Sequence, residues 1–268
     1  MKLLTGIMIT LLVLLGATSE GETSARTKVA EGEYAISSPE DLGVGPLETE
    51  VFHFHETWEL WWSADGFYQL EGSRTFESPK DEPREEDFQA ILSSKFELQE
   101  IVLRSHLRFV RDSGPFLTCT GNASEFVCDS GGKDPVHTRH IRLDESGPYA
   151  IIWPISVFSM GHVAFLASEQ EVKPLKIGLI QIKEINPVLP IMTIQSSGTI
   201  QYLGRSQVAY AISGTSWLPR VFRLASETTR NLYIWTSTEG IVLAIQSQSP
   251  EVTIQLIRFT QFAPFQAR

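Results

Sequence analysis

The chain has 268 residues and a formal net charge of −10, which arises from 32 acidic and 22 basic residues. Binding to a nucleic-acid backbone requires clustered lysine and arginine, so this acidic chain with scattered basic residues is not expected to bind nucleic acid. The length allows one large β domain or two small ones, with enough apolar core to fold without a framework of disulfides.

The N-terminus predicts export. Lys2 precedes an apolar run over residues 3–15, which is shorter than the roughly 20 residues that span a bilayer, and small residues follow it. We expect residues 1–19 to be a cleaved signal peptide, the alternative being an uncleaved anchor. A secreted or periplasmic protein, soluble and without a later membrane span, is therefore predicted. Bacterial lipid attachment needs a cysteine directly after the cleavage point, and the first cysteine is Cys119, so a lipoprotein is not expected.

The next part of the chain changes from an arm to strands. Residues 20–48 are rich in small and polar types and predict a flexible N-terminal arm. From 51 to 62, aromatic and apolar residues alternate with polar ones, which predicts a half-buried strand. The turn signal Asp65-Gly66 and renewed alternation predict a hairpin. The charged stretch 78–87, with two prolines, predicts a solvated loop.

The two cysteines, Cys119 and Cys128, predict a disulfide. If the turn between them centres on Ala123 and Ser124, the two face each other across a hairpin. Such a bridge closes a short loop and contributes about 2 to 3 kcal/mol at most. A metal pair would want more ligands nearby, and a redox pair a closer spacing. Asn122 begins a glycosylation sequon, which matters only if the source is eukaryotic.

The second half of the chain predicts one helix followed by a meander. Residues 147–170, with helical spacing after Pro154, form a predicted helical connection. Closely spaced strand and turn patterns over 171–268 predict a C-terminal β half, which matches an N-terminal β half over 49–146. We therefore expect a mainly β fold, either an antiparallel curved sheet or a half-open β-barrel of two meander halves with one central helix.

The two halves also resemble each other weakly. Asp65-Gly66 follows an aromatic-rich strand, and Glu239-Gly240 follows another. This similarity hints at a distant internal repeat.

The sequence contains no short catalytic signature, and it predicts no cofactor. His53 and His55 are weak candidate metal ligands because they share one face of a strand. A solvated polar face explains them better, and His137 and His140 would complete a site only if the fold brought them near. An enzyme is the least favoured interpretation.

Glu56 lies on the apolar parity of its strand, between Phe54 and Trp58. If it is buried there, its pKa rises, as a general acid requires. A strand bulge that exposes the carboxylate, or a paired carboxylate, is the favoured explanation.

Aromatic residues form the most suggestive pattern. A curved sheet with a helix across it could surround an apolar groove, although the same residues could simply be core. The candidate groove residues are Trp58, Trp62, Trp153, Phe158 and Trp235.

The C-terminal half carries a loose spacing of aromatics and glycines. The residues concerned are Tyr202-Leu203-Gly204-Arg205, Val208, Gly214-Thr215, Phe222-Arg223-Leu224, Tyr233-Ile234-Trp235-Thr236 and Glu239-Gly240. Over 198–262, with a fainter echo in 51–110, this pattern resembles uncharacterised bacterial envelope proteins similar to the outer-membrane lipoprotein carriers and receptors. The resemblance implies a half-open β-barrel that receives acyl chains. The chain departs from those carriers in having one predicted helix and a hairpin disulfide.

These observations together favour an exported β protein that binds a lipid or other apolar ligand in the cell envelope. Two other interpretations stay open at this point. One is a structural or interaction protein of the envelope that binds no ligand, and the other is an unrecognised enzyme.

Overall fold

The computed structural model describes residues 26–36, 53–78, 81–107, 117–121, 125–130, 137–142, 149–152, 156–167, 173–183, 192–226, 230–248 and 251–266. The predicted signal peptide at 1–19, Asn122 and Trp153 lie outside these ranges.

The described residues are mainly β, as predicted. The strands are β1 (Arg26–Ile36), β2 (His53–Ser63), β3 (Tyr68–Ser78), β4 (Asp81–Leu92), β5 (Leu98–Leu107), β6 (Leu117–Gly121), β7 (Glu125–Ser130), β8 (His137–Arg142), β9 (Tyr149–Ile152), β10 (Leu175–Lys183), β11 (Met192–Arg205), β12 (Tyr210–Ile212), β13 (Thr215–Trp217), β14 (Arg220–Ser226), β15 (Arg230–Thr236), β16 (Val242–Gln248) and β17 (Glu251–Gln261). Two short helical elements, the 3-10 helix η2 (Val157–His162) and the α-helix α1 (Val163–Leu166), follow β9.

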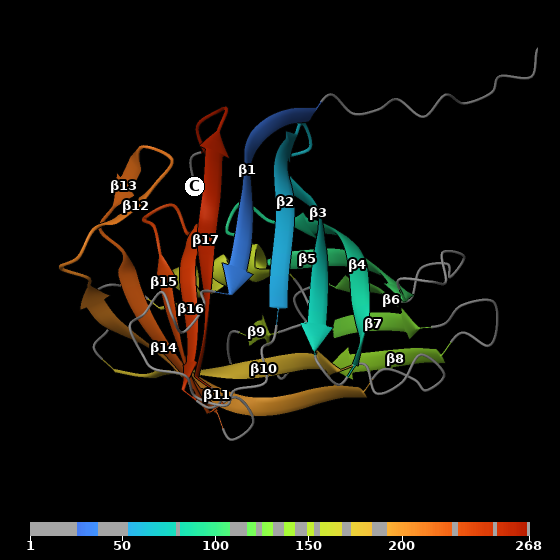
Figure 1. The fold of residues 1–268 in the computed structure, drawn as a ribbon. Coiled ribbons are helices and arrows are strands. Elements are labelled where there is room, and N and C mark those ends of the chain that lie inside the picture. The colour runs from blue at the N-terminus through green and yellow to red at the C-terminus, as the bar shows by residue number, and fades with distance from the viewer. Residues whose placement is uncertain are drawn as a thin grey trace, which may run out of the picture.

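Fifteen of these strands form one sheet, in the order β8-β7-β6-β5-β4-β3-β2-β1-β17-β16-β15-β14-β11-β10-β9. β9 and β10 pair in parallel, and the other neighbouring pairs in this order are antiparallel. The sheet thus consists of two meanders, and they join where β1 pairs with β17 in its middle (Figure 1). β12 and β13 form a separate hairpin.

The connection between the two edge strands shows that the sheet is rolled. β8 and β9 lie at opposite edges, yet only six residues, 143–148, separate Arg142 from Tyr149 in the chain. Seven residue steps can span at most about 25 Å. A flat sheet of this strand number would hold its edges roughly 65 to 70 Å apart. The sheet must therefore curl into a barrel-like shape with an inner face and an outer face.

The prediction of a flexible N-terminal arm is wrong over residues 26–36, because these residues form β1 in the middle of the sheet. Ala30, Gly32 and Tyr34 are buried. Two of these inward residues are small, so the segment looks polar and does not read as a strand. Gly32 has to be small, because a Cβ there would lie 2.6 Å from Cζ2 of Trp58 on β2.

The predicted loop at 78–87 is also wrong for most of its length, because β4 begins at Asp81. Glu85 and Asp87 face solvent, whereas Glu86 between them is buried. Charged residues on both parities of this stretch hid the alternation that a strand requires.

The predicted central helix is shorter than expected and preceded by a strand. Residues 149–152 of the predicted helical connection form β9, and η2 and α1 are the helical elements among its described residues. Among the described residues, no helix has the length and apolar character needed to cross a membrane.

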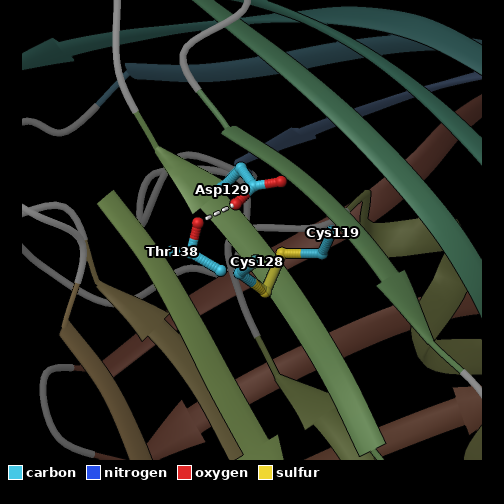
Figure 2. Close-up of a disulfide and its surroundings, with 4 residues drawn as sticks. All are labelled: Cys119, Cys128, Asp129 and Thr138. Atoms are coloured by element: carbon cyan, nitrogen blue, oxygen red, sulfur yellow. Dashed lines mark hydrogen bonds between the residues drawn. A yellow bond between two sulfur atoms is a disulfide. The ribbon is translucent and has the colours of Figure 1, made fainter. Parts of the chain in front are cut away.

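The predicted disulfide between Cys119 and Cys128 is confirmed, and the two residues pair directly across the β6–β7 hairpin (Figure 2). Both cysteines are buried. Beside the bridge, the Thr138 hydroxyl on β8 donates a 2.6 Å hydrogen bond to Oδ1 of Asp129. A structural disulfide indicates that the protein folds in an oxidising compartment.

Removing the bridge should destabilise the protein modestly. In a Cys119→Ala/Cys128→Ala variant we expect the free energy of unfolding to fall by about 2 to 3 kcal/mol, because the closed loop is short. Urea titration with and without reductant checks this. The variant is its own control, since reductant should not affect it. Equal stability of the oxidised and reduced wild-type protein would contradict the expectation.

Candidate functional site

Four polar residues form one buried row across the inner face of the sheet. In register, Tyr34 on β1 faces Glu56 on β2, Glu56 faces Arg74 on β3, and Arg74 faces Glu86 on β4. None of the four is more than 5% exposed. Charged residues are almost never buried unless they are paired, so each member of this row needs a partner.

Within the row, Arg74 and Glu86 form a hydrogen-bonded ion pair. Nε and Nη2 of Arg74 both donate to Oε2 of Glu86, at 2.8 and 2.5 Å. The hydroxyl of Tyr34 donates to the backbone carbonyl of Val242 on β16, at 2.9 Å. Burial, together with the nearby charge of Glu56, raises the pKa of Tyr34 well above its ordinary value, so this hydroxyl stays protonated.

Glu56 finds its partners in the helical segment 156–167, which we call the plug. The Ser156 hydroxyl donates to Oε1 of Glu56 at 2.6 Å, and the backbone amide of Val157 donates to the same oxygen at 2.9 Å. The carboxylate therefore caps the first turn of η2, whose amides have no partner within the helix. β2 pairs with β3 without a register shift from His53 to Trp62. The prediction of a bulge that exposes Glu56 is therefore wrong, and the carboxyl is buried with hydroxyl and amide donors as its hydrogen-bond partners.

The environment of Glu56 changes its acidity. Burial raises its pKa from 4.5 to about 7, against the opposing effects of the Arg74 charge and of hydrogen bonds from Ser156, Val157 and Phe158. The carboxyl thus gains and loses its proton near neutral pH, as the parity of the strand suggested. Because the side chain is fully buried beneath the plug, it cannot meet a substrate while the plug is docked.

Aromatic rings hold the rest of the plug. The Phe158 ring lies 4.5 Å from that of Trp58 and 5.0 Å from that of Phe96, between ring centroids. Phe96 also contacts Phe165 at 5.8 Å and Tyr68 at 5.3 Å. We call these five residues the aromatic cluster, and it joins the plug to the inner face of the sheet.

Three hairpins share one type of turn, over residues 63–67, 93–97 and 237–241. In each, the amide of the first residue, a serine, bonds to the carbonyl of the fifth, and the fourth residue has a positive φ. Glycine occupies that fourth position in two of the turns, but the other holds Phe96 with a φ of 60°. A non-glycine residue in this conformation costs about 1 to 3 kcal/mol and persists only where surrounding contacts require it. Here the contacts are those of the aromatic cluster.

The β15–β16 turn touches the plug directly. A Cβ on Gly161 of the plug would lie 1.9 Å from the carbonyl oxygen of Gly240, and a Cβ on Gly240 would lie 2.6 Å from Cζ of Phe165. The plug is thus packed against a turn from each half of the chain. The similarity between Asp65-Gly66 and Glu239-Gly240 in the sequence corresponds to this shared turn type.

The structure brings three of the predicted groove residues into one region. Trp58 and Phe158 are buried and in contact within the aromatic cluster. Trp62 is half-buried, with its ring 4.7 Å from that of Tyr68. Trp153 lies outside the described residues.

Trp235 lies apart from them. The strand registers place it in one cross-strand row with Ala244, Gln255, Ala35 and His55, on the outer face of the sheet. Its neighbour Ile234, which is buried, faces inward instead. The prediction that Trp235 shares a groove with Trp58 is therefore wrong, because an aromatic side chain does not reveal which face of a strand it occupies.

The candidate metal ligands are also separated. His53 and His55 lie on the outer face, and Nε2 of His55 is 3.5 Å from a carboxylate oxygen of Glu33. His140 lies on β8 and contacts Glu125, and five strands stand between β8 and β2 in the sheet. In the part of the chain that the structure describes, no three potential ligands gather to hold a metal ion.

Sequence reasoning missed Arg74, Glu86, Ser156 and Phe96. Arg74 shares the parity of the buried Leu70, so alternation along β3 would have flagged it as an inward charge. Glu86 was hidden in the supposed loop. Ser156 is a typical residue for a helix start, but nothing in the sequence links it to a carboxylate one hundred residues away.

Comparison with known proteins identifies the fold and nothing finer. Neither the models of protein families nor the curated proteins contain a match to this sequence. Among solved structures, the chain is similar to a β-barrel-like protein of the domain of unknown function DUF1849 from Brucella abortus. The TM-score is 0.52 at 9% sequence identity, and the similarity covers 88% of this chain and 97% of that chain. The chain therefore has a β-barrel-like fold.

The raised pKa of Glu56 predicts a specific pH dependence of stability. Below its ordinary value of 4.5 the carboxyl is protonated in both the folded and unfolded states, and above about 7 it is ionised in both. Between pH 4.5 and about pH 7, the carboxyl is ionised in the unfolded state but still protonated in the folded state. The free energy of unfolding therefore falls by about 3 kcal/mol as the pH rises through this range. Glu56→Gln should remove this contribution. Urea titrations at several pH values check it, with Glu59→Gln on the outer face as control. Parallel pH curves for wild type and Glu56→Gln would contradict it.

Two glycines with the same φ of 86° test how tightly the plug is held. Gly66→Ala should cost about 1 kcal/mol through left-handed strain alone, because its Cβ would meet no atom within 4 Å. Gly240→Ala should cost about 1 to 3 kcal/mol more, because its Cβ would collide with Phe165. Chemical denaturation of both variants measures the difference. Equal losses would show that the plug is not closely packed on this turn.

Proposed function

We propose that this protein binds an apolar chain, such as the acyl chain of a lipid, on the inner face of its rolled sheet, in the space that the plug fills. The observation that carries this proposal is the nature of the plug. It consists of a 3-10 helix and a four-residue α-helix, whose buried side chains include Phe158 and Met160. Helices this short are unstable alone, so tertiary contacts decide where the plug lies.

The surface beneath the plug suits a hydrocarbon. Trp58, Tyr68 and Phe96 present rings from β2, β3 and the β4–β5 turn. Each methylene that leaves water for such a surface contributes about 0.8 kcal/mol, so a long chain can replace the contacts of Phe158 and Phe165.

Two further observations support the proposal. Over residues 198–262 the sequence resembles uncharacterised bacterial envelope proteins, which are similar to the outer-membrane lipoprotein carriers and receptors that receive acyl chains in a half-open β-barrel. The disulfide indicates an oxidising compartment, which is where an exported envelope protein folds.

Weakening the plug should increase binding. We expect the full chain to bind the neutral fluorescent probe N-phenyl-1-naphthylamine, and Phe158→Ala to bind it about fivefold more tightly or better, because the plug loses its central ring contact. Phe222→Ala is the matched control, since Phe222 is equally buried but lies on β14. Fluorescence titration measures the affinities, and native mass spectrometry of the purified protein detects bound lipid. Absence of both probe binding and lipid would refute the proposal.

A further inference from the structure

We infer that the ligand carries a hydrogen-bond donor at its polar end, an amine, amide or hydroxyl group, which occupies the place of the plug's first residues against Glu56. This inference rests on the proposed function and adds the chemical class of the head group.

The contacts of the plug show what this place requires. Ser156 and Val157 present a hydroxyl and a backbone amide to Glu56, and both are donors. If an apolar chain displaces the plug, these donors leave with it. A buried carboxylate without donors is unfavourable, so a ligand that brings its own is favoured over one that does not.

The polar groups beside Glu56 donate to other partners, so the ligand has to supply the donors that Glu56 needs. Arg74 directs Nε and Nη2 to Glu86, and the Tyr34 hydroxyl is directed to Val242 on another strand. The row contains two carboxylates and one guanidinium, so its charge attracts a cation and repels an anion. A free fatty acid would place its carboxylate against Glu56. An alkyl or acyl amphiphile with an N–H or O–H head group fits instead.

Three amphiphiles, each with a straight chain of twelve carbons counting the carboxyl carbon of the acid, separate the effects of donor and charge at constant chain length. Dodecylamine is cationic and donates, dodecyltrimethylammonium is cationic without a donor, and dodecanoate is anionic. At about pH 8 and below their micelle concentrations, we expect dodecylamine to displace N-phenyl-1-naphthylamine from the wild-type chain about tenfold more effectively than the other two. This comparison needs no variant and so does not depend on a variant folding.

Two variants then locate the effect. Glu56→Gln should reduce the preference for dodecylamine below about threefold, because the neutral amide loses the charge-assisted bond. Glu59→Gln removes the same charge from the outer face of the same strand, where Glu59 contacts Lys28, and should leave the preference unchanged.

The outcomes distinguish this inference from the proposed function. If the three amphiphiles bind equally, or if Glu56→Gln keeps the preference, the head-group inference fails while apolar binding stands. If none of them binds, the proposed function fails as well.

Discussion

The short connection between β8 and β9 is the constraint on which the other features depend. Because six residues must join the two edges of a fifteen-stranded sheet, the sheet has to roll, and rolling gives it an interior. Residues of one parity on every strand then face that interior, whatever their chemistry. The aromatic cluster lies in this interior, and the polar residues on this parity must find partners inside it. The row from Tyr34 to Glu86 is the result.

Burying a carboxylate costs free energy. Here the buried Glu56 positions another part of the chain, the plug. Apolar contacts alone would let the plug shift along the inner face of the sheet, because they have little directionality. The bonds from Ser156 and Val157 to Glu56 fix where η2 begins. The Arg74–Glu86 pair beside them limits the cost of the charge. Polar groups inside a core can thus specify one arrangement even where they add little stability.

The sequence predicts the features that depend on local pattern. Alternation over 51–62 predicted the strand that the structure has at His53–Ser63, together with the inward position of Glu56, and turn symmetry paired Cys119 with Cys128. It failed where side chains were small or charged, as in β1 and β4, since neither Gly32 nor Glu86 looks like an inward residue. It also could not give the register between distant segments. That register decides that Ser156 meets Glu56 and that Trp235 faces outward.

The pairing of β1 with β17 has a consequence for how the protein is made. The first and last strands of the described chain lie side by side in the middle of the sheet, so the N-terminal meander has an unpaired inner edge until the C-terminus has emerged. Contacts this far apart in sequence form slowly. A chain that delays completion of its core in this way stays open during synthesis.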